Sequence, residues 1–123
     1  MDDVICMNEV SKSYRTNLAE PAVNGLTMNV PAGILYGLVG PDGAGKTTIL
    51  RMLSTVMLPS KGPITVLGFD TRTKADTIRR QVGYMPQNFS LYPDLTVREN
   101  LFFFADIQQM RAEQKSVRMA EML

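Results

Sequence analysis

The feature of this sequence that most constrains its fold is an ungapped glycine-rich pattern, preceded by an apolar run. The pattern G-x-x-x-x-G-K-[ST] is matched by Gly40, Pro41, Asp42, Gly43, Ala44, Gly45, Lys46 and Thr47. Residues 34–39 before it are almost wholly apolar, which is typical of a strand buried on both faces. Apolar residues after it recur at spacings of three and four up to Met57, before Pro59, and predict a helix. A strand, glycine loop and helix in this order predict an α/β fold.

The residue types in this loop suit the binding of a polyphosphate. Glycines let the backbone fold tightly around an anion with its N–H groups inward, and the helix start adds its positive end. The Lys46 ammonium can reach outer phosphates, and the Thr47 hydroxyl offers Mg²⁺ a hard oxygen ligand. The Asp42 carboxylate would repel phosphate, so we expect its side chain to point away or to cap a neighbouring N–H. The alternative for the loop is a strand-to-helix turn without a ligand.

Weaker patterns predict the remaining elements. Strands are expected at residues 4–10, 22–30, 64–67 and 82–85, and helices at 75–81, from 97 to about 110, and from 112 to the end. Thr73 or Asp76 is the expected cap of the helix at 75–81. Thr96 and Glu99 fit the S/T-x-x-E capping box before the next helix.

Composition excludes several classes of protein. The 123 residues are 45% hydrophobic and 20% charged, which indicates one soluble globular domain. A net charge of +1 gives no general attraction to nucleic acid, so none is expected as a partner. Cys6 is the only cysteine and histidine is absent, which excludes a disulfide framework, a cysteine-rich zinc site and histidine catalysis. The uncharged stretch between Glu20 and Asp42 contains prolines and glycines, so it predicts strands and not a membrane helix. The acidic start does not resemble a signal peptide, and a cytosolic chain is expected.

Three runs together resemble the ATP-binding subunits of ABC transporters, and more narrowly those of ABC-2 type exporters such as multidrug efflux ATPases. The runs are ILYGLVGPDGAGKTTILRML, VLGFD and RRQVGYMPQNFSLYPDLTVRENLFFFA. The resemblance implies the N-terminal half of a P-loop NTPase (RecA-like) core, with an antiparallel β subdomain and the start of a helical subdomain. Residues 1–123 would then form a truncated ATP-binding domain, with the β subdomain and core portion at about 1–95 and the helical subdomain starting at 96–123.

The resemblance also implies roles for individual residues, with ATP and Mg²⁺ as cofactors. Lys46 and Gln87 would be catalytic, and Thr47 and Gln87 would approach the metal. In the family this glutamine also approaches the attacking water and senses the membrane partner. ATP would be bound by Tyr14, which stacks on adenine, and by Gly40, Pro41, Asp42, Gly43, Ala44, Gly45, Lys46, Thr47 and Thr48. Phe102, Phe103 and Phe104 are expected in a helix core, while a few apolar residues among 88–104 would face the transmembrane subunit.

Several family motifs do not occur in these 123 residues. The sequence has no Ser-Gly-Gly for an LSGGQ-like signature and no histidine for a switch. The apolar runs that end at Asp70 and Asp106 mimic a Walker B strand, but neither is followed by glutamate. The sequence also stops within an apolar-periodic stretch, as in a cut chain. We therefore expect weak nucleotide binding, negligible hydrolysis and poor stability from a sheet with exposed edges.

The function implied is that of an ABC exporter subunit that couples ATP binding and hydrolysis to transport. Its expected partners are an ABC-2 type transmembrane permease and a second ATP-binding subunit or domain. It would be cytoplasmic and held at the inner face of the cell membrane through the permease. One alternative is a small P-loop phosphotransferase such as a nucleotide kinase, but Arg79, Arg80 and Arg111 are too few and scattered for its lid. Another is a non-transport ABC-type protein or a nucleotide-responsive interaction module, which the neutral charge and the exporter-like runs disfavour.

Overall fold

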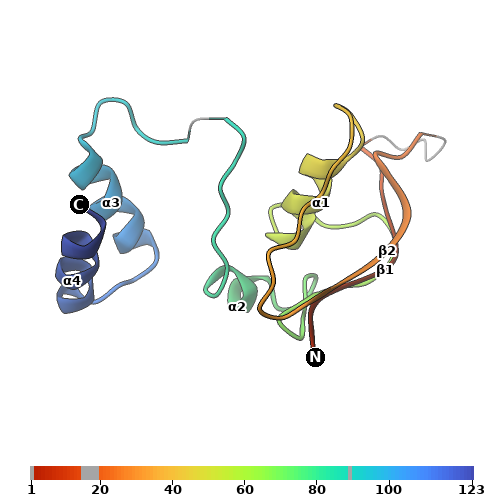
Figure 1. The fold of residues 1–123 in the computed structure, drawn as a ribbon, viewed down its shortest axis with the longest axis horizontal. Coiled ribbons are helices and arrows are strands. Elements are labelled where there is room, and N and C mark those ends of the chain that lie inside the picture. Colours follow the sequence, from red (N-terminus) through yellow and green to blue (C-terminus); the bar gives the residue numbers. More distant parts are fainter. Residues whose placement is uncertain (1, 15–19, 89) are drawn as a thin grey trace. The chain divides into compact units, whose positions relative to one another are not determined.

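The computed structural model describes residues 2–14, 20–88 and 90–123, which form two compact units (Figure 1). The first unit extends to Tyr84 and the second begins at Met85. The first unit contains β1 (Asp3–Lys12), β2 (Val23–Pro31), α1 (Lys46–Leu53), β3 (Ile64–Val66), β4 (Phe69–Asp70) and α2 (Ala75–Arg79). The second unit contains α3 (Val97–Ile107) and α4 (Ala112–Met122).

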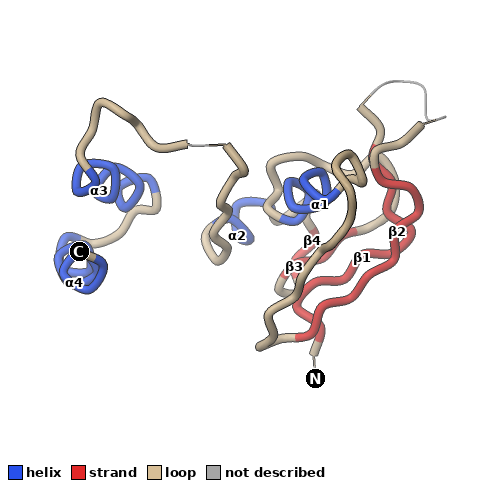
Figure 2. Tube along the Cα trace, turned by 45° about the horizontal axis from the view of Figure 1, so that its top comes forward, coloured by secondary structure: helices blue, strands red, loops and turns tan. Residues whose placement is uncertain are grey.

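The first unit is built on a four-stranded antiparallel sheet in the order β2-β1-β3-β4 (Figure 2). Strand β1 pairs on both sides, with Cys6 opposite Asn29 of β2 and Thr65 of β3. The antiparallel subdomain and its strands at 4–10, 22–30 and 64–67 are thereby confirmed. Strand β4 was not predicted. It follows a tight turn in which Leu67 and Gly68 both have positive φ, 53° and 80°, as the favoured two-residue hairpin turns require.

The hydrophobic core of the first unit lies where α1 and α2 pack against the sheet. Its buried members come from three strands and both helices. They are Met7, Val10, Val23, Ile49, Met52, Ile64, Val66 and Ile78. The spacing of Ile49 and Met52 places both side chains on one face of α1, as the helical pattern predicts. The core therefore fixes α1, and with it the glycine loop that precedes α1.

Two predicted strands are absent from the part of the chain that the structure describes. Residues 34–39 and 82–85 form neither a strand nor a helix. Leu35 and Val39 are almost completely exposed, at 101% and 99%, and Met85 is 91% exposed. An apolar run becomes a buried strand only when neighbouring strands supply hydrogen bonds and cover its faces. No described strand pairs with either run, so both predictions were wrong for this chain.

The helix ends differ from the prediction, since α2 ends at Arg79 instead of Gln81 and α3 ends at Ile107 instead of about residue 110. Helix α1 ends at Leu53 instead of Met57, and Thr55 then adopts φ 62°. The N-cap of α2 is Lys74, and its side chain makes no capping bond, so neither Thr73 nor Asp76 is the cap. The Asp70 carboxylate instead accepts hydrogen bonds from the backbone N–H groups of Arg72 and Thr73, at 2.7 and 3.3 Å.

The second unit consists of the two helices predicted after residue 96. The capping box is confirmed, because Thr96 accepts from the Glu99 N–H at 3.2 Å and Glu99 accepts from the Thr96 N–H at 2.7 Å. Phe102, Phe103 and Phe104 are each 38–39% exposed and do not form the predicted buried core. Phe103 instead makes edge-to-face contacts with Tyr92 and Phe104, at centroid distances of 5.0 and 5.6 Å. Within the described ranges, no helix is long and apolar enough to cross a membrane.

Candidate functional site

The glycine loop at residues 40–45 has a backbone that only glycine adopts readily. Gly43 and Gly45 have φ of 82° and 99°, in the left-handed region. A Cβ atom on Gly45 would also lie only 2.5 Å from the Ala22 carbonyl oxygen. Glycine is therefore required at 45 by both conformation and space.

The N-terminus of α1 opens directly from this loop and is not capped by a side chain. Gly45 is the N-cap residue, and the first turn contains no acidic side chain. The Ala44 N–H donates to the Pro41 carbonyl at 3.2 Å and closes a turn within the loop. The first N–H groups of a helix lack partners inside the helix and carry its positive end. This end of α1 is thus suited to an anion.

The Lys46 ammonium folds back across the loop. It donates to the Gly40 carbonyl and to the Pro41 carbonyl, the latter at 2.8 Å. The carbonyls at the start of the loop therefore place a positive charge beside the N-terminus of α1. Asp42, Gly43 and Ala44 are exposed, so the tip of the loop is open to solvent.

Two predicted binding residues that are far apart in sequence meet beside the loop. The Tyr14 and Thr48 hydroxyl oxygens are 2.8 Å apart, and the Tyr14 hydroxyl also lies 3.6 Å from the Met57 sulfur. The Lys12 ammonium lies over the Tyr14 ring, 5.9 Å from its centroid. Thr48 is buried at 7% exposure, whereas Tyr14 is 58% exposed. The structure thus holds an accessible aromatic ring beside the first turn of α1.

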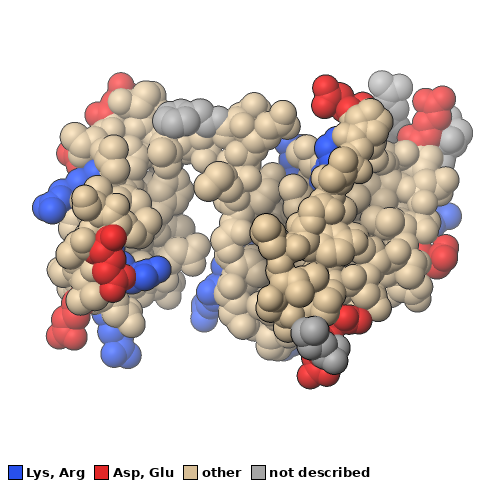
Figure 3. All heavy atoms as spheres, in the orientation of Figure 1, with Lys and Arg blue, Asp and Glu red and all other residues tan. Residues whose placement is uncertain are grey.

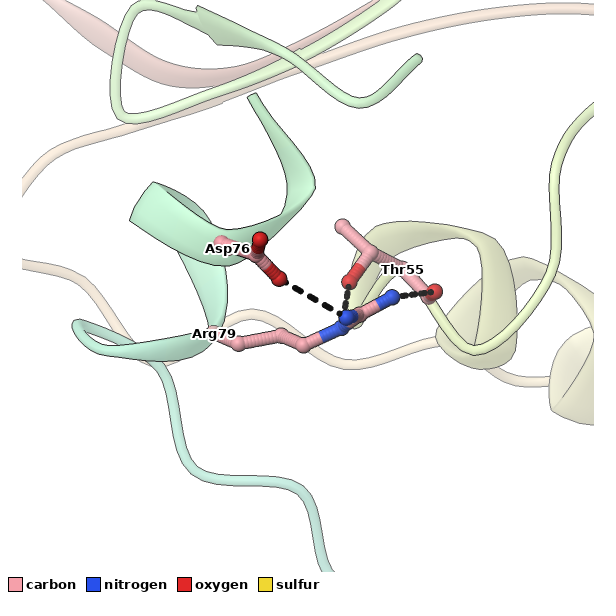
Figure 4. Close-up of polar contacts among 3 residues, drawn as sticks. All are labelled: Thr55, Asp76 and Arg79. Atoms are coloured by element: carbon pink, nitrogen blue, oxygen red, sulfur yellow. Dashed lines mark hydrogen bonds and ion pairs between the residues drawn. The ribbon is translucent and has the colours of Figure 1, made fainter. Parts of the chain in front are cut away.

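The other end of α1 is held by Arg79, which the sequence did not indicate (Figure 4). Its guanidinium donates to the hydroxyl and the carbonyl of Thr55, at 2.8 and 3.2 Å, and pairs with Asp76 at 3.1 Å. Thr55 is itself buried at 4% exposure. A cation at a helix C-terminus also opposes the negative end of the helix dipole. Arg79 therefore joins α2 to the end of α1.

Three candidates remain, Gln87, Asp70 and Asp106, and each is described within its own unit. Gln87 belongs to the second unit and is exposed. Asp70 accepts backbone hydrogen bonds next to α2, and Asp106 pairs with Lys115. Across residues 2–14, 20–88 and 90–123, no cluster of three or more His, Cys, Asp or Glu side chains could hold a metal ion. A metal here would take its protein ligands from groups such as the Thr47 hydroxyl and the rest from phosphate and water, which suits Mg²⁺.

Charge is mixed over the visible surface of both units. Figure 3 shows Lys and Arg side chains interspersed with Asp and Glu on the face drawn. This agrees with the net charge of +1. The cationic character of the loop is consequently local, and it comes from Lys46 and the N-terminus of α1.

Comparison with known proteins finds relatives that match nearly the whole chain. The probable multidrug ABC transporter ATP-binding protein YbhF of Escherichia coli (strain K12) is 43% identical over 122 residues, covering 99% of this chain and 21% of that protein. The daunorubicin/doxorubicin resistance ATP-binding protein DrrA of Streptomyces peucetius is 41% identical over 102 residues, covering 83% of this chain and 31% of that protein. The chain thus spans about a fifth to a third of these relatives.

A solved structure matches the fold as well. The dimeric post-hydrolysis state of the ATP-binding cassette MJ0796, bound to ADP and Pi, superposes with a TM-score of 0.80 at 26% identity, covering 95% of this chain and 54% of that one. The sequence profile of the ABC transporter family matches residues 23–123, which include the glycine loop, α1 and both helices of the second unit. From the loop geometry and these matches together, we conclude that the chain belongs to the ABC transporter family.

Proposed function

We propose that residues 40–48 bind the phosphates of ATP with Mg²⁺, as part of an ABC exporter ATP-binding subunit. One observation carries the proposal: a glycine loop with left-handed Gly43 and Gly45 leads into the uncapped N-terminus of α1, beside the Lys46 ammonium. Gly40, Asp42, Ala44 and the other loop residues would supply backbone N–H groups to the phosphates, while Pro41, which has no N–H, would shape the loop that holds them. Lys46 would exchange its loop carbonyls for phosphate oxygens, and Thr47 would offer its hydroxyl to Mg²⁺.

The other proposed contacts come from Tyr14 and Gln87. The exposed ring of Tyr14 would stack on adenine, because an aromatic face binds a purine at low entropic cost. Gln87 would approach Mg²⁺ and the attacking water, as the resemblance implies. When bound, the metal would neutralise charge on the phosphates.

The proposed setting is a transporter. The relatives are named as ATP-binding proteins of multidrug transport and drug resistance, and the solved cassette is a dimer bound to ADP and Pi. We infer that the whole protein works with an ABC-2 type permease and a second ATP-binding subunit at the inner face of the membrane. The 123 residues contain no LSGGQ-like motif and no histidine, so this chain alone is proposed to bind nucleotide weakly and to hydrolyse it negligibly.

Isothermal titration calorimetry with Mg-ATP tests the binding site. Lys46→Ala should weaken binding about tenfold or more, because it removes charge-assisted hydrogen bonds to phosphate. Lys61→Ala is the matched control, since it removes an exposed lysine of the same unit and should leave the affinity unchanged. Equal affinity in the unchanged chain and in Lys46→Ala would contradict the proposal. Phosphate release above background that Lys46→Ala abolishes would contradict the proposed inactivity.

A further inference from the structure

The contact between Tyr14 and Thr48 involves a group that base stacking does not use. Stacking requires only the ring of Tyr14, yet its hydroxyl is held 2.8 Å from the Thr48 hydroxyl. The alternative acceptor, the Met57 sulfur at 3.6 Å, is a weak one. Thr48 is therefore the principal partner of the Tyr14 hydroxyl.

The position of Thr48 gives this contact a chemical consequence. Thr48 is the third residue of α1 and lies in its first turn, where the leading N–H groups have no partner inside the helix. A hydroxyl has one proton to donate and two lone pairs that accept. When Tyr14 donates to Thr48, the Thr48 proton remains available to an anion at the N-terminus of α1. Consecutive hydrogen bonds of this kind polarise and strengthen one another.

We propose that Tyr14 is a positioning residue for the phosphates, acting through the hydroxyl of Thr48. Its hydroxyl orients the Thr48 proton toward a phosphate oxygen, and this role is separate from any stacking by the ring. The inference rests on the proposed function, because it requires an anion at residues 40–48. Lys12 also contacts this tyrosine: its ammonium lies over the Tyr14 ring and donates to the Leu58 carbonyl at 2.8 Å.

Inorganic tripolyphosphate separates the two roles of Tyr14, because it has phosphates but no base to stack. Calorimetry would compare Mg-tripolyphosphate and Mg-ATP on the full chain, Tyr14→Phe, Thr48→Val and the double variant. Tyr14→Phe keeps the ring and should weaken both ligands about two- to tenfold, the usual effect of one hydrogen bond. In the double variant, the loss should be smaller than the product of the single losses, because both changes break the same chain of hydrogen bonds. Thr48→Ser keeps the hydroxyl and should restore most of the affinity.

Tyr36→Phe is the matched control. It removes a half-exposed tyrosine hydroxyl from the same unit and should change neither affinity, while circular dichroism checks that each variant is folded. Unchanged or tighter tripolyphosphate binding by folded Tyr14→Phe would overturn the inference and leave the proposed function standing. Fully multiplicative losses in the double variant would overturn it as well. If the unchanged chain binds neither ligand, or Lys46→Ala binds both equally well, the proposed function fails together with the inference.

Discussion

Different interactions stabilise the two units of the chain. In the first unit, residues distant in sequence pair in one sheet, and eight buried side chains form a continuous core. In the second unit, the described residues bury only Asn100 and Met119, and most of the organising contacts are local. The capping box spans the four residues 96–99, and the Asn100 side chain bonds to the loop just before its own helix. A core thus shapes the first unit, whereas hydrogen bonds at helix ends shape the second.

Core truncation should show the largest effect and affect the first unit alone. Met52 has no exposed surface, so Met52→Ala leaves a cavity and should lower the free energy of unfolding of the first unit by about 3 kcal/mol. Urea unfolding measures this change. Leu50→Ala is the matched control in the same helix, where a 47% exposed side chain should contribute below about 1 kcal/mol. Hydrogen exchange of α3 and α4 should not change, and faster exchange there would show that the units unfold together.

A polar truncation should have the next largest effect, now in the second unit. The Asn100 amide donates to the carbonyls of Tyr92, Leu95 and Thr96, at 3.0–3.2 Å, and accepts from the Tyr92 N–H at 2.9 Å. Asn100→Ala should destabilise α3 by about 2 kcal/mol, because it removes all the hydrogen bonds that this buried side chain makes to the backbone.

The measurement for Asn100→Ala is the hydrogen-exchange protection of the α3 amides. Gln108→Ala, which removes an exposed amide side chain from the end of the same helix, should change protection by less than about 0.5 kcal/mol. Equal protection in the two variants would show that helix-end hydrogen bonds do not shape this unit.

Acidification should give the smallest effect, through the capping box. Hydrogen bonds from the backbone and hydroxyl of Thr96 lower the pKa of Glu99 below its usual value. A group with a lowered folded-state pKa stabilises the helix above its unfolded-state pKa, and that contribution is lost as pH falls through the folded-state pKa. NMR shifts of the α3 amides should therefore report weaker capping once the pH falls below the ordinary glutamate pKa of about 4.3. Glu99→Gln should remove this pH dependence, and a persisting transition would assign it to another group.

Local signals in the sequence were sufficient where the structure depends on local interactions. The capping box at Thr96, the helices of the second unit and the helix after the glycine loop all follow from short-range patterns. The strands predicted at 4–10 and 22–30 are also present, because they pair with each other in an antiparallel arrangement. The loop glycines were expected to let the backbone fold tightly, and Gly43 and Gly45 have positive φ.

The errors occur where structure depends on distant partners. The apolar run at 34–39 has the composition of a central strand, but composition does not show whether neighbouring strands are available to pair with it. The roles of Arg79 and Asn100 depend on side-chain contacts that no motif encodes. The meeting of Tyr14 with Thr48 likewise depends on how the chain folds, although each residue was noted separately.

The Arg79 contact has a mechanical consequence for the glycine loop. The core fixes one face of α1, and Arg79 fixes the Thr55 turn at its end. Helices α1 and α2 are therefore expected to behave as one rigid piece. The glycine loop lies at the N-terminus of α1. Helix α2, which Arg79 joins to the other end of α1, is followed after a few residues by the boundary of the first unit at Tyr84. Arg79 thereby ties the segment that leads out of the first unit to the same core-held helix that positions the glycine loop.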